Sequence, residues 1–244
     1  MTTVILGIAG AGGALARRLV AAGKPVHLLA RSSDKLAALR ASLGGAPACT
    51  AVDVLDTAAY EEALKALAAA GPVAGLVYGV GSIPLKPLKA TSTADFVDAF
   101  RLNTLGAALA LKHLAPALAA GATPGSAVFF STVAAGTGFP LHAAIAAAKG
   151  GVEALARATA AELAPRVRVN VIAPSLTDTP LAARMTSSDA MRKALGDAHP
   201  LPRLGSADDL ASMAAFLLDD AQSGWITGQV FNVDGGRSTL RPRN

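Results

Sequence analysis

Hydroxyl, imidazole and ammonium side chains gather in one short part of the chain. Ser131 and Thr132 follow an apolar run of the strand type, and an Ala-rich segment that predicts a helix comes after a glycine-rich turn. At about 100° per residue, His142, Ile145 and Lys149 lie within roughly 40° of one another on that helix. A strand end with hydroxyls therefore faces a helix with a histidine and a lysine. Such groups can polarise an oxygen atom and exchange a proton with it.

The elements that position these residues alternate along the chain. Apolar runs of the strand type lie at 3–8, 26–30, 48–53, 74–80, 127–131, 167–172 and 229–233. Segments of the helix type, rich in Ala and Leu, lie at 12–22, 33–43, 57–70, 93–120, 141–164 and 207–219. This alternation requires right-handed crossovers, and the continuous apolar runs are typical of strands covered on both faces. The pattern predicts an α/β fold: a Rossmann-type, doubly wound parallel sheet of about seven strands with helices on both faces.

Composition limits the class of protein. The chain has 244 residues, of which 52% are hydrophobic and 16% charged, so one large core can form. No linker, low-complexity block or repeat interrupts it, and we expect 1–244 to be a single domain. The longest connection without a strand, from about 175 to 203, predicts a substrate lid near 180–203.

Charge and cysteine usage exclude several partners. The net charge is +5 and the pI about 9.7, but Lys and Arg are scattered and aromatic residues make up 4%, so we expect no nucleic-acid partner. The amino terminus lacks the basic region of a signal peptide, and no apolar run reaches membrane-spanning length. The single Cys49 suits a reducing compartment, which predicts a cytoplasmic protein. We expect no metal site.

A glycine-rich turn joins the first strand-type run to the first helix-type segment. It contains Gly7, Gly10, Gly12 and Gly13. Glycines let the backbone approach a pyrophosphate, whose charge is attracted by the free N–H groups and the dipole at a helix start. A tight packing turn is the alternative interpretation, but the position between first strand and first helix favours a dinucleotide-binding domain.

The second strand-type run ends in residues that bear on cofactor choice. Ala30 stands where an acid would bind a ribose 2′-hydroxyl, and Arg31 and Ser32 follow it. A guanidinium and a hydroxyl suit a 2′-phosphate, so NADP(H) is expected in preference to NAD(H). In the alternative interpretation Arg31 is a surface cation and Ser32 caps the next helix.

Together these residues resemble the short-chain dehydrogenase/reductase family, and the resemblance covers essentially the whole chain. In that family a strand-end Ser faces a helix carrying Tyr-x-x-x-Lys, and an Asn-x-x-Gly motif lies in the preceding long helix. Lys149 fits the Lys, Thr132 stands at the Ser position with Ser131 beside it, and Asn103 begins the Asn-x-x-Gly. The Tyr position is occupied by Ile145, which has no ionisable atom.

The resemblance implies further cofactor contacts. Asp53 and Val54 would contact the adenine, Gly79 and Gly81 would allow close backbone approach, and Pro174, Thr177 and Thr179 would contact the nicotinamide carboxamide. For Asp53, an exposed turn position is the alternative. The chain departs from the family where Gly7, Gly10 and Gly13 give G-x-x-G-x-x-G and where Ser175 replaces a Gly.

The resemblance also implies roles in the reaction. Hydride would pass between the nicotinamide and a substrate carbon, while Lys149 binds the nicotinamide ribose, Asn103 holds a water against Lys149, and Thr132 polarises a carbonyl. The proton donor is left open. His142 precedes Lys149 at a spacing similar to the Tyr-x6-Lys of the family's enoyl-reductase branch, and an imidazole is a competent acid near neutral pH. A partly buried or surface histidine is the alternative, and a water held by Lys149, Asn103 and Thr132 is the second possible donor.

The expected function follows in two forms. The first is an NADP(H)-dependent oxidoreductase that reduces a carbonyl, or an activated alkene, with a non-standard proton donor. The second is a cofactor-binding pseudoenzyme that acts as a sensor or as the partner of a related subunit, which the loss of the Tyr favours. Leu181, Met185, Met191 and Leu195 in the lid predict an apolar small-molecule substrate. The resemblance also implies a homotetramer or a homodimer.

Overall fold

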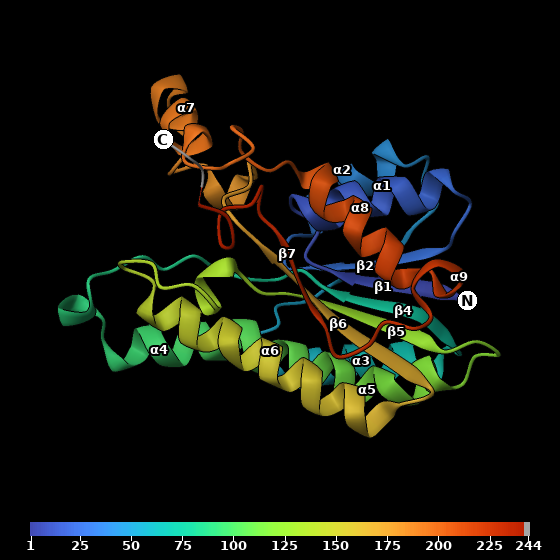
Figure 1. The fold of residues 1–244 in the computed structure, drawn as a ribbon. Helices are drawn as coiled ribbons and strands as arrows, with labels where there is room; N and C mark the ends of the chain where they lie inside the picture. Colours follow the sequence, from blue (N-terminus) through green and yellow to red (C-terminus); the bar gives the residue numbers. More distant parts are fainter. Residues whose placement is uncertain (242–244) are drawn as a thin grey trace.

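The structure, a computed structural model, describes residues 1–241 and is built around one parallel sheet (Figure 1). Its seven strands lie in the order β3-β2-β1-β4-β5-β6-β7, which confirms the predicted fold class. The strands are β1 (Thr2–Leu6), β2 (Val26–Ala30), β3 (Ala48–Ala51), β4 (Val73–Tyr78), β5 (Gly125–Phe130), β6 (Val167–Pro174) and β7 (Val230–Val233). The strand order reverses between β1 and β4, and such a switch point is where doubly wound sheets bind ligands.

Helices cover both faces of the sheet, and each face has its own apolar core (Figure 1). The helices are α1 (Ala11–Ala21), α2 (Ser33–Ser42), α3 (Thr57–Ala69), α4 (Thr93–Phe100), α5 (Gly106–Ala119), α6 (Ala143–Leu163), α7 (Asp189–Asp197), α8 (Ala207–Leu218) and α9 (Asp220–Ser223). Side chains of α1, α2 and α8 pack on one face, and side chains of α3, α5 and α6 pack on the other. Both faces of the central strands are therefore buried, which explains their continuous apolar sequence.

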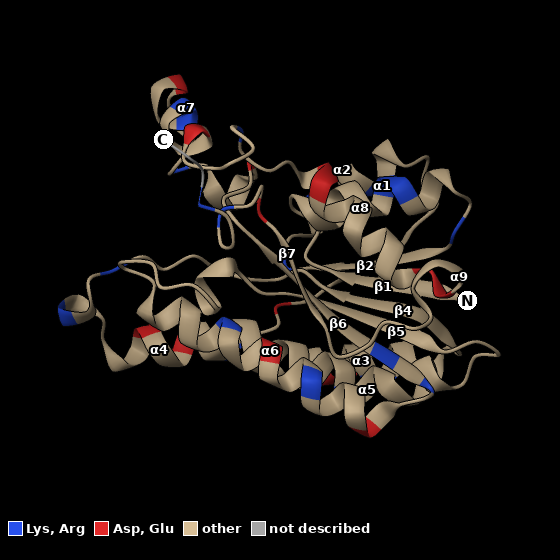
Figure 2. Cartoon of the chain, viewed as in Figure 1, with Lys and Arg blue, Asp and Glu red and all other residues tan. Residues whose placement is uncertain are grey.

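The surface carries charges of both signs. Figure 2 shows Lys and Arg distributed among Asp and Glu over the helices on both sides of the sheet. Among residues 1–241, no helix combines the length and the apolarity needed to cross a membrane.

The long helical segment predicted at 93–120 is interrupted in its middle. A π-helical turn, η2 (Arg101–Leu105), separates α4 from α5, and the Gly106 N–H donates to Arg101 O, five residues earlier. Side chains from neighbouring elements bond the backbone around this turn. Tyr78 Oη donates to Leu102 O at 2.6 Å, and Tyr60 Oη donates to Gly106 O at 3.0 Å. The widened turn is thus held by hydrogen bonds from the sheet and from α3.

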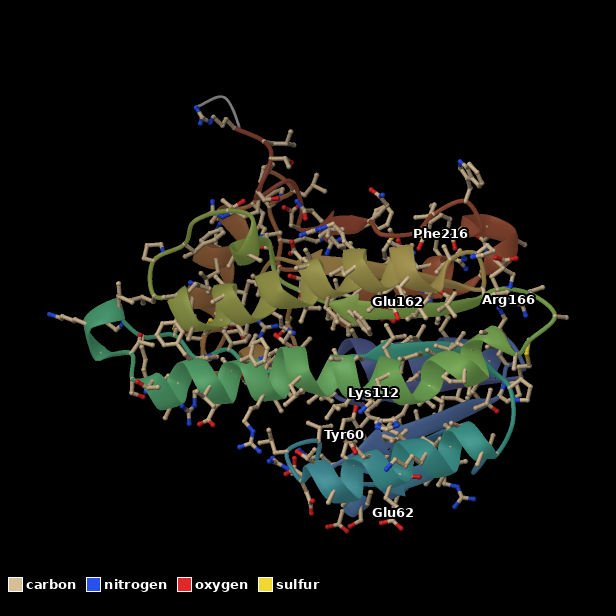
Figure 3. The ribbon with its side chains drawn as sticks, turned by 90° about the horizontal axis from the view of Figure 1, so that it is seen from below. Tyr60, Glu62, Lys112, Glu162, Arg166 and Phe216 are labelled. Atoms are coloured by element: carbon tan, nitrogen blue, oxygen red, sulfur yellow. The ribbon has the colours of Figure 1, made fainter. Side chains whose placement is uncertain are left out.

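Figure 3 shows how α3 contributes to this support. Tyr60 points from α3 toward α5, whereas Glu62 on the same helix points away from the protein. Tyr60 is fully buried, and desolvation by burial raises the pKa of its phenol above the usual range. The hydroxyl therefore stays protonated and serves as a permanent donor to Gly106 O.

Gly106 is required by the same contact. A Cβ at residue 106 would lie 2.0 Å from Tyr78 Oη, which is far inside van der Waals contact. Tyr78 is itself buried between the sheet and α5, so it has no open space into which to move.

We expect Gly106→Ala to lower the free energy of unfolding by about 2 kcal/mol, because it displaces Tyr78 and leaves Leu102 O without its donor. The matched control is Gly150→Ala in α6, where a Cβ meets nothing within 4 Å and the change should raise stability by about 1 kcal/mol. Urea unfolding of the two variants measures the difference. Equal stability of both would show that Tyr78 does not constrain residue 106.

Candidate active site

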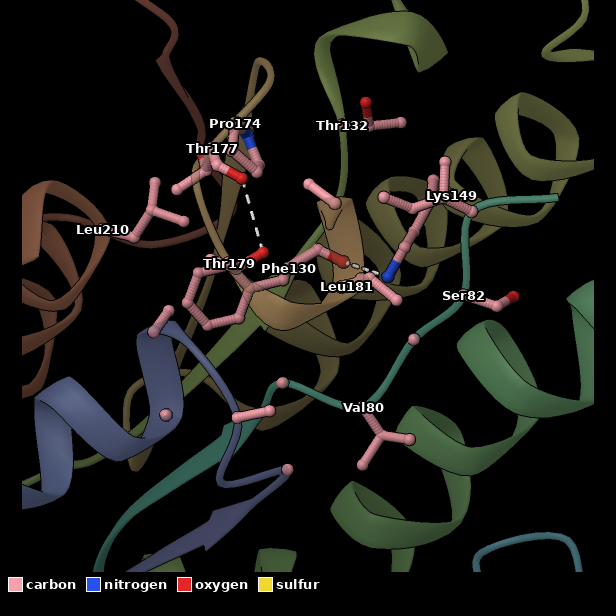
Figure 4. Close-up of a pocket in the computed structure, with 18 of the residues that line it drawn as sticks. Val80, Ser82, Phe130, Thr132, Lys149, Pro174, Thr177, Thr179, Leu181 and Leu210 are labelled. Atoms are coloured by element: carbon pink, nitrogen blue, oxygen red, sulfur yellow. Dashed lines mark hydrogen bonds between the residues drawn. The ribbon is translucent and has the colours of Figure 1, made fainter. Parts of the chain in front are cut away.

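A large cavity opens at the carboxyl ends of β1, β4, β5 and β6 (Figure 4). Its volume is about 670 Å³, which is enough for a dinucleotide fragment and a small substrate side by side. Most residues that the sequence singled out line it: Gly7, Gly12, Arg31, Ser32, Asp53, Val54, Gly79, Gly81, Ser131, Thr132, His142, Lys149, Pro174, Thr177 and Thr179. Gly10, Gly13 and Asn103 are not among the residues that line it.

The glycine turn places the start of α1 at the switch point. Gly10 has φ +60 and is the residue immediately before α1. Because no helical turn precedes it, the first amides of α1 have no helical carbonyl to bond. A Cβ at Gly12 would lie 1.9 Å from Gly7 O, and one at Gly13 would lie 2.5 Å from Ile8 O. The turn therefore folds back on itself and leaves its N–H groups available for an anion.

The loop after β6 packs against this turn. A Cβ at residue 10 would lie 2.8 Å from Thr179 Cγ2, so only a glycine lets the two segments meet. Thr179 Oγ1 in turn donates to Thr177 O at 3.4 Å (Figure 4). Residues predicted to bind the pyrophosphate and the nicotinamide carboxamide of a dinucleotide thus lie close together.

The adenosine end of the cavity carries two exposed cations. The Arg31 side chain is 81% exposed, and its Nη1 lies 3.8 Å from Asp53 Oδ2. Lys35, which sequence reasoning missed, lines the same end. Ser32 Oγ accepts a hydrogen bond from Lys35 N at 3.3 Å and caps α2, as the alternative interpretation expected. Asp53 Oδ1 accepts from Leu55 N at 3.0 Å, so the carboxylate also shapes its own turn.

Lys149 is the buried cation of the site. Only 7% of the residue is exposed, and Nζ donates to Phe130 O at 2.7 Å (Figure 4). Burial lowers the pKa of the Lys149 ammonium to about 7, because desolvation penalises the charged form. Lys149 can therefore both bind an oxygen ligand and change its charge near neutral pH.

Asn103 lies on the π-helical turn and faces Lys149. Its Nδ2 donates to Ala99 O at 2.8 Å, while Oδ1 is buried and has no hydrogen-bond partner within the described part of the chain. A Cβ at Gly81 would lie 2.9 Å from Asn103 Oδ1 and 3.3 Å from Lys149 Nζ. The amide oxygen and the ammonium thus converge on one small space, which a side chain at residue 81 would fill. An acceptor and a donor so placed suit a bridging water.

The two hydroxyls after β5 have different surroundings. Ser131 Oγ donates to Glu153 Oε1 at 2.6 Å, so its proton points into α6. Thr132 Oγ1 accepts from Ala134 N at 3.3 Å, which leaves the hydroxyl proton free to donate elsewhere. Of the two, Thr132 is the better placed to polarise a ligand.

Position 145 lies in the cavity wall, as the helical spacing predicted. Ile145 is 3% exposed and offers no polar atom. His142 stands at the start of α6, where Nδ1 lies 2.7 Å from Pro140 O. Because a carbonyl only accepts, Nδ1 carries a proton and Nε2 is the nitrogen available to other groups. The ring of Phe139 lies 5.6 Å from that of His142.

The segment predicted to be a lid is partly helical. It contains η4 (Pro180–Ala182) and α7, and an ion pair between Arg192 and Asp178 joins α7 to the loop after β6. Leu181, Met185 and Leu195 line the cavity as expected. The expectation for Met191 is wrong: its side chain is 42% exposed and packs beside Ser187 Oγ, outside the cavity wall.

One polar pair in the wall was not found from the sequence. Ser175 Oγ lies 2.9 Å from His199 Nε2, and His199 Nδ1 lies 2.9 Å from Leu195 O. Both residues line the cavity, and His199 is only 6% exposed. The one signal in the sequence was Ser175 at a position where a glycine was expected.

Comparison with known proteins agrees with this geometry. A family model described as enoyl-(acyl carrier protein) reductase matches residues 7–238. A Xanthobacter autotrophicus protein named inactive 2-(S)-hydroxypropyl-CoM dehydrogenase 2 is 32% identical over 232 residues, which are 93% of this chain and 100% of that protein.

Two solved structures are similar over nearly the whole chain. A short-chain type dehydrogenase/reductase from Mycobacterium ulcerans has a TM-score of 0.90 at 34% identity, covering 98% of this chain and 90% of that one. The structure of ElxO with NADP bound has a TM-score of 0.86 at 25% identity, covering 98% of this chain and all of that one. Sequence and structure matches of this length show that the chain belongs to the short-chain dehydrogenase/reductase family.

Proposed function

We propose that the protein is an NADP(H)-dependent oxidoreductase that reduces the carbonyl group, or an activated alkene, of an apolar small molecule. The observation that carries the proposal is the convergence at Gly81 of Lys149 Nζ and Asn103 Oδ1, which has no hydrogen-bond partner among residues 1–241. A protein that only bound a nucleotide would not need a buried ammonium next to a buried acceptor, because both are costly to desolvate. The apolar lid residues Leu181, Met185 and Leu195 support an apolar substrate.

The residues present fit a bound dinucleotide. The amides at the start of α1 suit the pyrophosphate, and Lys149 Nζ has protons left to donate to the hydroxyls of a ribose. Pro174, Thr177 and Thr179 would contact the nicotinamide carboxamide, and Asp53 and Val54 would contact the adenine. When bound, the nicotinamide supplies a hydride to the substrate.

The preference for NADP(H) rests on the charge at the adenosine end. Arg31 and Lys35 are exposed cations in the cavity wall, and Ala30 places no carboxylate where a 2′-phosphate would lie. The Asp53 carboxylate lies 3.8 Å from the Arg31 guanidinium, which is longer than a hydrogen bond. The guanidinium therefore keeps its N–H donors for a phosphate. The NADP-bound ElxO structure is a neighbour of this chain, which supports the same choice.

The protein's own groups would activate the substrate as follows. Thr132 donates its free hydroxyl proton to the carbonyl oxygen and thereby makes the carbon more electrophilic. Ile145 takes no part in proton transfer. The sequence offers two candidate proton donors, His142 Nε2 and a water held by Lys149, Asn103 and Thr132.

A second candidate function is an NADP(H)-binding pseudoenzyme that acts as a sensor or as a partner subunit. The apolar Ile145 favours it, and the name of the Xanthobacter relative describes that protein as inactive. NADPH oxidation with a panel of ketones, quinones and enones separates the two functions. Micromolar NADPH binding without turnover of any of them would favour the pseudoenzyme.

We also propose that copies of the chain associate, as a homodimer or homotetramer. Phe96, Val97 and Phe100 leave 37%, 48% and 49% of their surface exposed on one helix, α4, and Trp225 is fully exposed. Apolar side chains gathered on one helix are typical of an interface. The cytoplasmic location stays a prediction.

We expect Arg31→Ala to raise the Kd of NADPH about tenfold and to leave the Kd of NADH unchanged, because only NADPH carries the 2′-phosphate that Arg31 binds. Arg40→Ala, at the other end of α2, removes an exposed guanidinium that bonds Gly45 O and serves as the control. Fluorescence titration measures both affinities. Equal losses for the two cofactors would contradict the assigned phosphate contact.

We expect Ile145→Tyr to increase kcat for ketone reduction by about 10²-fold, because a phenol beside Lys149 restores a general acid. Ile145→Phe adds the same ring without the hydroxyl and should give no increase. Steady-state assays with NADPH compare the two variants. A gain shared by both would mean that shape rather than proton donation limits the wild-type reaction.

A further inference from the structure

The Ser175–His199 pair has the geometry of a hydroxyl coupled to a base. Ser175 Oγ lies 2.9 Å from His199 Nε2, and His199 Nδ1 lies 2.9 Å from Leu195 O. Because Leu195 O only accepts, Nδ1 must carry a proton. In the neutral ring Nε2 therefore accepts the proton of Ser175. This is the arrangement in which a third group orients a histidine toward a hydroxyl.

The pair lies beside the residues assigned to the reaction. Phe130 of β5 is in register with Ile172 of β6, and the bond from Ser131 N to Ile172 O at 2.8 Å continues the pairing past the end of β5. Thr132 and Ser175 therefore leave neighbouring strands at the same edge of the sheet. Neighbouring strands lie about 4.8 Å apart, and both side chains line the same cavity. Thr132 and Ser175 thus belong to one wall of the cavity, at the ends of adjacent strands.

His142 lacks such a connection. Its recorded contacts are Pro140 O through Nδ1 and the ring of Phe139, and neither holds a hydroxyl toward the cavity. His199 is deeply placed, with 6% of its surface exposed, and it lines the cavity together with Ser175.

Protonation of His199 would reverse the hydrogen bond of the pair. In the imidazolium form Nε2–H donates to Ser175 Oγ, which releases the hydroxyl proton of Ser175 to donate into the cavity. Histidine is the side-chain type whose unperturbed charge changes between about pH 5 and 8. Thr132 has no titratable partner of this kind among its recorded contacts.

We propose that Ser175 and His199 together supply the substrate proton that Ile145 cannot supply. The proposal rests on the oxidoreductase function proposed above. As the carbonyl carbon accepts the hydride with its electron pair, the π electrons of the C=O bond move to the oxygen. The oxygen takes the proton from Ser175 Oγ, and Oγ takes the proton from His199 Nε2. His199 is left neutral and regains its proton from water.

Several charged groups surround His199. Asp234, after β7, interacts electrostatically with its ring, and Arg237 of the same segment donates to Ala198 O at 2.7 Å. On α7, Asp197 is paired with Lys193 at 2.6 Å. The pH profile of the wild type therefore reports His199 together with these neighbours, and the variants must separate them.

The experiment compares two variants that remove one member of the pair each. Ser175→Ala removes the hydroxyl, and His199→Gln keeps an amide that can bond Ser175 and Leu195 O but cannot titrate. We expect each to lower kcat for carbonyl reduction about 10²-fold and to change the limb of the pH–rate profile near neutral pH, to which Lys149 also contributes. The Kd of NADPH and the Tm should stay close to those of the wild type, which a purely structural pair would not allow.

Two further variants complete the test. Ser175→Thr keeps a hydroxyl and should retain most of the activity together with the pH limb. His27→Gln removes a histidine of β2 that bonds Thr50 Oγ1 at 2.8 Å and does not line the cavity. This control should change neither kcat nor the pH limb. The proposal would be overturned if His199→Gln retained both kcat and the pH limb. It would also be overturned if His142→Gln lost both instead. In either case the oxidoreductase function would stand. Wild-type protein that binds NADPH but reduces nothing in the panel would refute the function, and the proton route with it.

Discussion

The buried ammonium of Lys149 is the constraint on which the rest of the site depends. Taking a charge out of water is costly unless fixed dipoles replace the water, and Phe130 O at 2.7 Å is the dipole that the strand provides. A second acceptor, Asn103 Oδ1, reaches this region because the helix widens into a π turn between α4 and α5. This π turn is held by the hydrogen bond from Tyr78 to its backbone, for which Gly106 leaves the space. The surroundings of this one charge thus involve residues of β4, β5, α5 and α6.

The sequence was sufficient for the sheet and for most of the residues that line the cavity. Strands buried on both faces must be apolar throughout, and the glycine turn and Arg31 are local features that need no long-range information. The break in the helix at 101–105 could not be predicted in this way. It depends on Tyr60 and Tyr78, which reach the turn from other elements of the fold.

The Ser175–His199 pair could not be predicted either, because it also depends on a contact between residues that are distant in the sequence. Ser175 and His199 are 24 positions apart, and only the folded lid brings Oγ and Nε2 to 2.9 Å. Met191 failed as a wall residue because the register of α7 turns it outward, and periodicity in a short helix does not reveal which face is covered. Ser131 was a second candidate hydroxyl beside Thr132 in the sequence. The structure shows that the Ser131 hydroxyl proton is donated to Glu153 on α6.

The low pKa of Lys149, about 7, also makes the site a point of thermodynamic linkage. A bound ribose whose hydroxyls accepted from this ammonium would select the charged form, so above neutrality its binding would draw a proton from the buffer. The apparent association constant would then decline with alkalinity, by at most about tenfold per pH unit. Occupancy of the proposed nucleotide site would in this way be tied to the acidity of the surroundings, through one nitrogen atom.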